Sequence, residues 1–310
     1  MAPPSRFVLT LIADREAAPL DPRLVAQVRE ALRAPAPIVL SEGEAVDLPL
    51  DALPAREQVA AAIGAAAVDA IAQPAAGRRK RLLVADMDST IVTSETLDEL
   101  AAHAGLKEEI AAITRRSMNG EIDFREALRE RVAMLRGLAM EALEATWART
   151  DYVAGARELI ATMRAHGATT ALVSGGFTFF TERVAAQLGF HHHRSNVLLH
   201  QGGRLTGEIA EPILDRDAKL AALREFAAGL GVGLEATAAV GDGANDLAML
   251  RAAGLGVAFR AKPVVAAEAR AELRHAGLRG VLFAQGYRAD EIIGGPGGGP
   301  GGGPGAGPAG

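Results

Sequence analysis

The feature that most constrains this chain is a short apolar run, Leu82–Ala85, followed by two aspartates, Asp86 and Asp88. Such a run is typical of a buried strand in a parallel sheet, because these strands are apolar on both faces. Side chains two positions apart on a strand share a face, so we expect Asp86 and Asp88 to point the same way. They would do so at the carboxyl end of the strand, where open α/β sheets bind their ligands.

Two carboxylates held side by side repel each other unless a positive charge lies near them. A hard divalent cation with oxygen ligands meets this need. We therefore expect chemistry at this point, with Asp86 as a nucleophile or metal ligand and Asp88 as its acid/base partner. The alternative is a strand that ends in ordinary turn residues, since aspartate and serine are common in turns.

Composition limits the class of protein. The chain has 310 residues, 49% of them hydrophobic, which is enough for one large domain or two modest ones. It has no cysteine, which excludes disulfides, thiolate metal sites and cysteine nucleophiles. The net charge of −5 does not suggest a nucleic-acid partner. No stretch approaches the roughly 20 apolar residues of a membrane span, and no signal-peptide layout is visible, so we expect a cytoplasmic protein without membrane contact.

The pattern divides the chain into three parts. Residues 1–78 predict a small α+β domain with no convergent polar residues, hence a structural or regulatory role. Residues 79–293 carry the α/β pattern, and residues 294–310 are glycine and proline without a three-residue period, which predicts a disordered tail. In the first part we expect strands at 7–13, 37–40 and 45–48 and helices at 22–34 and 56–71. The basic stretch 78–81 is interpreted as a solvated junction.

Residues 97–150 predict a wholly helical insertion directly after the two aspartates. Asp123, three residues before Glu126, is placed to cap one of its helices. Counting from that cap, Phe124 and Arg131 fall on the same helical face, so Arg131 is a cation within an apolar stripe. Its spacing alone favours an arginine whose stem packs while its head reaches solvent. The alternative is a functional cation that faces inward.

The α/β pattern resumes with a predicted strand at 169–173, which ends in Ser174 and Gly175 before a predicted helix. A strand, a glycine turn and a helix N-terminus together favour an anion, because backbone N–H groups and the helix dipole point at it. The Ser174 hydroxyl adds a donor. A tight turn that needs glycine for its flexibility is the alternative.

A second predicted strand, 236–240, also ends in acids. Asp242 and Asp246 would face the same cation as Asp86 if the two strands are neighbours; the alternatives are a turn residue and a helix cap. A further helix is expected from Asp215, and it contains Lys219. The spacing of Lys219 does not distinguish it from an ordinary surface lysine.

The remaining segments carry weaker signals. The histidines at 191–193 are interpreted as a loop, because three consecutive imidazoles cannot face one metal from a strand. Residues 197–201 and 204–209, joined by two glycines, predict a β-hairpin. Residues 256–259 and 281–284 are predicted as the last strands.

Together, these motifs resemble those of the haloacid dehalogenase-like phosphohydrolases over about residues 80 to 285. The resemblance rests on Asp86-Met-Asp-Ser-Thr, Ser174-Gly-Gly-Phe-Thr, Lys219 and Gly241-Asp-Gly-Ala-Asn-Asp246, in that order. It implies an α/β fold, namely a Rossmann-like parallel sheet core with an inserted helical cap at about 97–150. The first 78 residues would then be a small N-terminal α+β domain, similar to the ACT-like regulatory domains of some members.

The stretches from Asp86 to Glu95 and around Phe124 and Arg131 resemble, more closely, members that hydrolyse phosphoserine. This implies Mg²⁺-dependent hydrolysis of O-phospho-L-serine through an aspartyl phosphate, the last step of serine biosynthesis. The implied catalytic residues are the nucleophile Asp86, the acid and base Asp88, and Lys219. The implied Mg²⁺ ligands are Asp86 (carboxylate), Asp88 (carbonyl) and Asp242 (carboxylate), with Asp246 in support. The implied substrate-binding residues are Ser174, Gly175, Lys219 and Asn245 for the phosphate, Glu95 for the ammonium group and Arg131 for the carboxylate.

Two alternatives stay open. One is a phosphatase for another small phosphomonoester, or a phosphotransferase that passes the phosphoryl group to an alcohol. The other is a regulatory or binding module that has lost catalysis, against which the presence of Asp86, Asp88 and Lys219 argues. The expected partner is a small-molecule substrate, with no nucleic acid and no membrane. The sequence is compatible with a homodimer and does not fix the oligomeric state.

Overall fold

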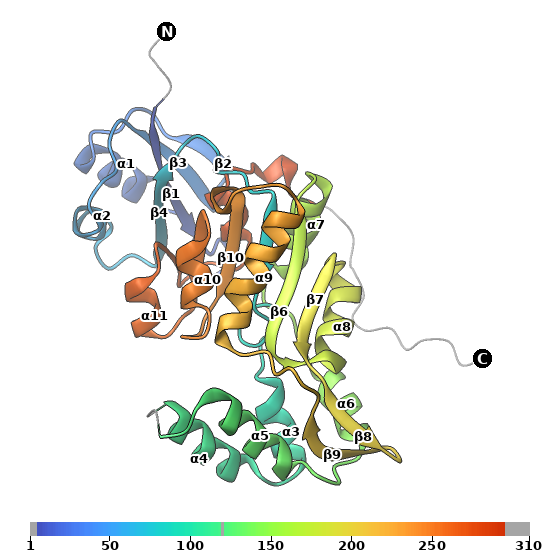
Figure 1. Ribbon diagram of the computed structural model, residues 1–310. Helices are drawn as coiled ribbons and strands as arrows, with labels where there is room; N and C mark the ends of the chain where they lie inside the picture. Colours follow the sequence, from blue (N-terminus) through green and yellow to red (C-terminus); the bar gives the residue numbers. More distant parts are fainter. Residues whose placement is uncertain (1–4, 119–120, 295–310) are drawn as a thin grey trace.

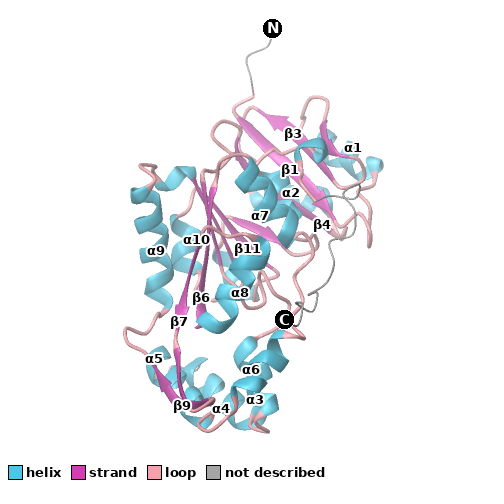
Figure 2. Ribbon diagram, turned by 90° about the vertical axis from the view of Figure 1, so that its right-hand side faces the viewer, coloured by secondary structure: helices cyan, strands magenta, loops and turns pink. Residues whose placement is uncertain are grey.

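The computed structural model describes residues 5–118 and 121–294. An antiparallel sheet from the start of the chain lies at one end, a parallel sheet with helices lies in the middle, and a group of helices with a hairpin lies at the other end (Figure 1). Figure 2, turned by 90°, shows the same order. Within the described residues, no helix is long and apolar enough to cross a membrane.

The N-terminal sheet has the strand order β2-β3-β1-β4, with every neighbouring pair antiparallel. Two helices pack on one of its faces, as their shared core with the strands shows. Asp21 caps the first helix as predicted, since its carboxylate accepts from Arg23 N. The elements are β1 (Phe7–Ala13), α1 (Pro22–Ala31), β2 (Ile38–Ser41), β3 (Ala45–Leu50), α2 (Arg56–Ile63) and β4 (Val68–Pro74).

The prediction of one helix over residues 56–71 is wrong in its second half. Gly64 has a φ of 65°, a left-handed conformation that ends α2 after Ile63. Beyond it, burial alternates along β4, with Asp69 and Ile71 buried, and this strand pairs with β1. The alanine-rich composition favoured a helix, but the cross-strand pairing with β1 decided the conformation.

The central sheet confirms the predicted Rossmann-like parallel core. Its strand order is β12-β11-β10-β5-β6-β7, and all neighbouring pairs are parallel. After β5 the chain adds β6 and β7 on one side of it, and it then adds β10, β11 and β12 on the other side. The topological switch point therefore lies between β5 and β10. The strands are β5 (Leu82–Ala85), β6 (Thr169–Phe177), β7 (His192–Asn196), β10 (Thr237–Gly241), β11 (Leu255–Phe259) and β12 (Ala271–Leu273).

Helices cover both faces of this sheet because alternate strand residues point to opposite sides. Leu82 and Val84 belong to the core that includes α9, α10 and α11. Leu83 and Ala85 belong to the core that includes α7, α8 and α12. These helices are α7 (Ala156–Ala165), α8 (Thr178–Leu188), α9 (Arg216–Gly229), α10 (Leu247–Ala252), α11 (Pro263–Glu268) and α12 (Arg279–Ala284).

Two further predictions in this region are wrong. Residues 281–284 lie in α12, not in a strand; a short fully apolar run fits a buried helix equally well, and here it packs against α7 and β1. The histidines predicted as a loop enter β7 at His192. The His192 ring stacks on Phe226 with centroids 4.9 Å apart, and His191 Nδ1 accepts from Thr170 N. These histidines have structural partners.

The helical insertion is confirmed, and the predicted hairpin joins it. The Gly137 amide donates to the Leu205 carbonyl at 2.8 Å, and the Leu205 amide donates to the Leu138 carbonyl at 2.9 Å. The cap is therefore one unit built from two separate stretches of chain. Its elements are α3 (Thr96–His103), α4 (Lys107–Met118), α5 (Phe124–Met134), α6 (Met140–Trp147), β8 (Leu198–Gln201) and β9 (Arg204–Ile209).

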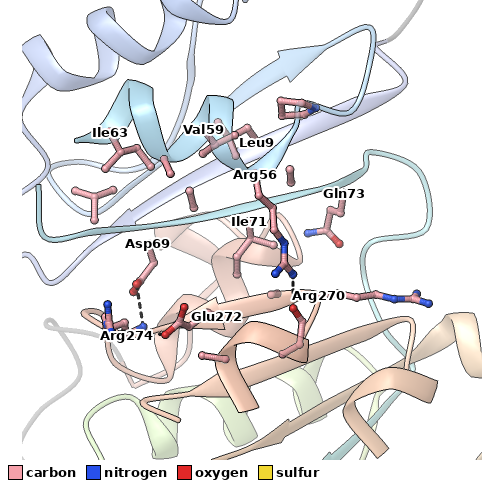
Figure 3. Close-up of a pocket in the computed structure, with 18 of the residues that line it drawn as sticks. Leu9, Arg56, Val59, Ile63, Asp69, Ile71, Gln73, Arg270, Glu272 and Arg274 are labelled. Atoms are coloured by element: carbon pink, nitrogen blue, oxygen red, sulfur yellow. Dashed lines mark hydrogen bonds and ion pairs between the residues drawn. The ribbon is translucent and has the colours of Figure 1, made fainter. Parts of the chain in front are cut away.

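Buried polar contacts join the N-terminal sheet to the parallel core. Asp69 accepts from the Arg274 and Ala276 amides at 2.8 Å each, and Arg56 reaches the Ala269 carbonyl across a cleft of about 760 Å³ (Figure 3). This cleft is lined by apolar residues together with charged ones, among them Arg56, Asp69 and Glu272, and contains none of the acids at the end of β5 or β10.

The basic junction at 78–81 is less solvated than predicted. Arg78 pairs with the buried Asp47, and Lys80 donates to the carbonyls of Gly77 and Glu235. The junction therefore anchors the N-terminal sheet to the parallel core. The domain boundary near residue 78 stays a prediction, and the predicted tail lies outside the described residues from 295 onward.

Candidate active site

Three buried or half-buried carboxylates meet at the switch point of the parallel sheet. Asp86 follows β5, and Asp242 and Asp246 follow β10; the two strands are neighbours, which is the condition on which these acids were expected to share a cation. One oxygen from each carboxylate lies within 4.8 Å of the others. Asp86 and Asp246 are 6% and 0% exposed. Their mutual repulsion in a dry site is large, so the cluster requires positive charge.

Lys219 supplies one such charge from the first turn of α9. Its Nζ lies 2.7 Å from Asp86 Oδ2 and 2.6 Å from Asp246 Oδ1, and its side chain is 1% exposed. The interpretation as a surface lysine is therefore wrong. Burial alone would lower the pKa of Lys219, but Asp246 and Asp86 outweigh it and raise the pKa above its ordinary value. Lys219 is a permanent cation at neutral pH.

One lysine does not balance three carboxylates. Among the described residues Asp242 has no cationic partner; Thr90 Oγ1 donates to it at 3.1 Å. Burial, followed by the charges of Asp246 and Glu95, raises the pKa of Asp242 to about 6. That uncompensated negative potential and the all-oxygen donor set fit a hard divalent metal ion. Thr90 was not among the predicted site residues, although its place in the Asp86 motif was a usable signal.

The Asp88 carboxylate stands apart from the three metal-binding carboxylates. β5 ends at Ala85, so the argument from a shared strand face does not hold for the two aspartates, and the Asp88 carboxylate is outside the three-acid cluster. It accepts from the Thr96 amide at 3.0 Å. A Cβ on Gly176 would come within 2.9 Å of Asp88 Oδ2, so a larger residue there would displace the Asp88 carboxylate.

The surroundings of Asp88 suit it to exchange a proton. Burial, with a further contribution from the Glu95 charge, raises the pKa of Asp88 to about 7. The Thr96 amide opposes this rise by stabilising the charged form. A carboxyl with a pKa near neutrality can serve as an acid in one step and as a base in the next.

Ser174 and Gly175 lie on the neighbouring strand. β6 continues through the glycines to Phe177, so in the described structure these glycines belong to the strand and do not form the predicted tight turn. The Ser174 side chain is buried and its Oγ accepts from Gly176 N at 2.9 Å. Asn245, also predicted for the phosphate, is half-buried and packs over Gly243.

A buried amide that the sequence analysis missed holds this strand in place. Asn196 Nδ2 donates to the Gly175 carbonyl at 2.9 Å, and its Oδ1 accepts from the Leu214 amide at 2.7 Å. It thereby ties β6 to the segment that leads into α9 and Lys219. No signal in the sequence distinguished Asn196 from an ordinary strand residue.

The two predicted substrate-reading residues lie at the cap side of the site. Glu95 precedes α3, accepts from Ser89 Oγ at 2.6 Å and raises the pKa of both Asp88 and Asp242, so its charge acts on the site. Ser89 has a φ of 53°, a left-handed conformation uncommon for serine.

Arg131 does not carry its head group out to solvent. Its Nε donates to the Ala127 carbonyl at 3.2 Å, and its Nη1 lies 3.5 Å from Thr114 Oγ1. Burial lowers the pKa of Arg131, against the raising effect of Asp98 and Glu95. The inward-facing alternative is the one that the structure supports. On the same helix, the tip of the Phe124 ring lies 3.4 Å from a Cβ built on Gly175, so the cap reaches the β6 strand.

Comparison with known proteins agrees with this geometry. The family model described as haloacid dehalogenase-like hydrolase matches residues 83–251. A phosphoserine phosphatase of Streptomyces coelicolor is 44% identical over 242 residues, which cover 77% of this chain and 59% of the relative. A phosphoserine phosphatase of Streptococcus thermophilus is 43% identical over 203 residues, covering 66% of this chain and 94% of the relative.

A solved structure of a phospho-aspartyl intermediate analogue of a phosphoserine phosphatase superposes with a TM-score of 0.62 at 38% identity. It covers 66% of this chain and 98% of its own. For three of the curated relatives, the match spans only 53% to 59% of the relative's length.

Proposed function

We propose that this chain, which belongs to the haloacid dehalogenase-like hydrolase family, hydrolyses O-phospho-L-serine to L-serine and phosphate. The observation that carries the proposal is Lys219, buried between Asp86 and Asp246 next to Asp242, which has no cationic partner among the residues that the structure describes. The assignment of phosphoserine as the substrate is supported by the names of the similar proteins and by the inward-facing Arg131.

The first half of the reaction uses Asp86 and Asp88. Asp86 Oδ attacks phosphorus, the bond from phosphorus to the serine oxygen breaks, and Asp88 gives that oxygen its proton. The product of this step is an aspartyl phosphate on Asp86 and free serine. A covalent intermediate divides one difficult displacement into two easier ones.

The second half restores the site. Asp88, now ionised, takes a proton from water as that water attacks phosphorus, and the bond from phosphorus to Asp86 breaks. Phosphate leaves, and Asp88 again holds the proton it needs for the next cycle. A pKa of about 7 for Asp88 supports both roles at neutral pH.

Phosphoryl transfer depends mainly on positioning and on neutralising charge. Lys219 provides a fixed positive charge next to Asp86, which otherwise would repel the phosphate. Ser174, Gly175 and Asn245 would add hydrogen-bond donors. Mg²⁺, held by the Asp86 and Asp242 carboxylates and the Asp88 carbonyl with Asp246 in support, would supply further neutralisation of the phosphate charge.

The cap would recognise the serine part of the substrate. An ammonium group suits the Glu95 carboxylate, and a carboxylate suits the guanidinium of Arg131 through a two-pronged contact. Burial lowers the pKa of Arg131, and the charges of Asp98 and Glu95 oppose this, so the two substrate-reading groups interact electrostatically. A cap that closes over the substrate would also exclude water while the aspartyl phosphate forms.

The proposal is tested by phosphate release from a panel of phosphomonoesters, with Mg²⁺ and with a chelator. We expect metal-dependent release that is strongly selective for L-phosphoserine over sugar, nucleotide and aryl phosphates. Equal metal-dependent activity over the whole panel would keep the mechanism and discard the substrate. Absence of activity on every member would instead favour a binding module.

Replacing Arg131 with alanine should act on one substrate class only. We expect kcat/KM for phosphoserine to fall about 100-fold, because a charged substrate group loses its partner, and that for an aryl phosphate to change little. The Arg136→Ala variant is a matched control, since Arg136 lies on the cap and pairs only loosely with Glu208 at 3.7 Å. Equal losses on both substrates would remove Arg131 as the carboxylate reader.

A homodimer and a cytoplasmic location remain predictions from the sequence. Sedimentation of the purified chain over a range of concentrations would decide the first of them.

A phosphotransferase acting on an alcohol is the second candidate function, and it is separated from hydrolysis by measuring phosphorylated alcohol among the products.

A further inference from the structure

One carboxylate connects the helical cap to the helix that carries Lys219. Asp215 is the N-cap of α9: its Oδ1 accepts from the amides of Asp217 at 3.0 Å and Ala218 at 3.3 Å. Its Oδ2 accepts from Arg125, with Nε at 2.8 Å and Nη2 at 2.7 Å. One oxygen therefore fixes the start of α9 and the other binds the cap.

The distance along the chain from this contact to the candidate site is one helical turn. Lys219 stands four residues after Asp215, where the direction of the first turn of α9 determines the position of its Nζ between Asp86 and Asp246. Arg125 is the second residue of α5, the cap helix that also carries Arg131. A change in the position of α5 would thus be transmitted to the start of α9.

A second arginine of α5 binds the same segment without touching the helix cap. Arg129, one turn after Arg125, has its Nη2 2.6 Å from Glu211 Oε1, and Glu211 Oε2 accepts from the Ile213 amide. Both ion pairs are partly exposed and hold the cap to the core. Of these two pairs, only the Arg125 pair involves the residue whose side chain caps α9.

We propose that Arg125 is a positioning residue that, through Asp215, couples closure of the helical cap to the placement of Lys219. The consequence rests on the proposed function, in which Lys219 binds the phosphate. When the cap closes over a substrate, Arg125 completes the partner set of Asp215 and orders the first turn of α9. When the cap opens to release phosphate, the first turn of α9 becomes less ordered, and Lys219 then binds the anion less tightly.

The test measures inorganic phosphate binding to the full chain in Mg²⁺ by calorimetry, together with KM for phosphoserine and for an aryl phosphate. Arg125→Ala should weaken phosphate binding about threefold to tenfold, in the range of a good partly exposed ion pair, and should raise both KM values by the same factor. This pattern differs from that of Arg131→Ala, which concerns phosphoserine alone. Arg129→Ala, the matched control, should leave phosphate affinity within about twofold of the original.

A double-mutant cycle separates coupling from simple loss of structure. The asparagine side chain in Asp215→Asn has one oxygen, which can cap α9 or accept from Arg125 but not both. We therefore expect Asp215→Asn to weaken phosphate binding as much as Arg125→Ala does. The double variant should be no weaker than either single variant. Unchanged affinity in Arg125→Ala, equal loss in Arg129→Ala, or additive losses would overturn the coupling. Phosphate binding and aryl phosphate turnover without phosphoserine turnover would reject the substrate but not the coupling. A wild-type chain that binds no phosphate would reject both.

Discussion

Asp86→Asn is expected to abolish turnover, with a fall in kcat of at least about 10⁴-fold, because an amide oxygen does not form the acyl phosphate. The same variant should yield no acid-stable, base-labile label after a quenched incubation with ³²P-labelled substrate. Asparagine is nearly isosteric, and Asp86 Oδ1 accepts from the Met87 amide, a contact that the new side chain retains through its oxygen. The measurement is phosphate release together with label trapping.

The control for this loss is a buried carboxylate elsewhere. Asp47 is 1% exposed in the N-terminal sheet, where it accepts from Thr10 and pairs with Arg78. Asp47→Asn should lower stability but leave the turnover of each folded molecule unchanged. Retained turnover or trapped label in Asp86→Asn would exclude Asp86 as the nucleophile.

Lys219→Met is the second change with a large expected effect, since it acts on both stability and activity. It leaves the fully buried Asp86 and Asp246 without their shared cation. Breaking a buried ion pair in this way costs about 3–5 kcal/mol of the free energy of unfolding, and kcat/KM for every phosphomonoester should fall at least about 10³-fold. Denaturant unfolding and the substrate panel measure the two effects.

The stability of this variant should depend on pH. Burial already raises the pKa of Asp86 even with Lys219 beside it, so the folded state holds that proton to a higher pH than the unfolded state does. Such a group reduces stability as pH rises above its unfolded pKa, about 3.9 for aspartate. Without Lys219 the effect is larger, and Lys219→Met in a chelating buffer should lose stability more steeply than the original chain as the pH rises above about 4.

Lys80 offers a matched control for these effects. It is also a buried lysine, at 8% exposed, but its Nζ donates to the Gly77 and Glu235 carbonyls rather than to carboxylates. Lys80→Met should lower stability without changing the substrate panel. If Lys219→Met lowered activity no more than Lys80→Met does, Lys219 would have no role in phosphate binding.

The sequence predicted the parts of the fold that short-range patterns encode. The apolar run Leu82–Ala85 predicted a buried strand, and the acids that follow it and the 236–240 strand indicated a site for a charged ligand. The local caps, Asp21 and Asp123, also follow from the sequence because each closes a helix start within three residues. Two of the wrong predictions, at 64–71 and 281–284, concern segments whose composition suits either a helix or a strand.

Several functional relationships required the tertiary structure. The spacing of Lys219 did not distinguish it from a surface lysine, and only the packing of α9 on the sheet places its Nζ between two buried carboxylates. Arg131 followed a pattern typical of an outward-facing arginine, and the surrounding cap turns it inward. Asn196 gave no signal at all, since its two partners are 21 and 18 residues away in the chain.

The sequence by itself determined which chemical groups this protein can bring to a reaction: three clusters of carboxylate, hydroxyl and glycine residues at strand ends, and one lysine. The tertiary structure decided their environment. Burial raises the pKa of Asp88 to about 7, and the single Lys219 leaves Asp242 without a cationic partner among the described residues. The physical reason is that side-chain identity is local, whereas desolvation and the distances between charges arise only when strands β5, β6 and β10 and helix α9 pack together.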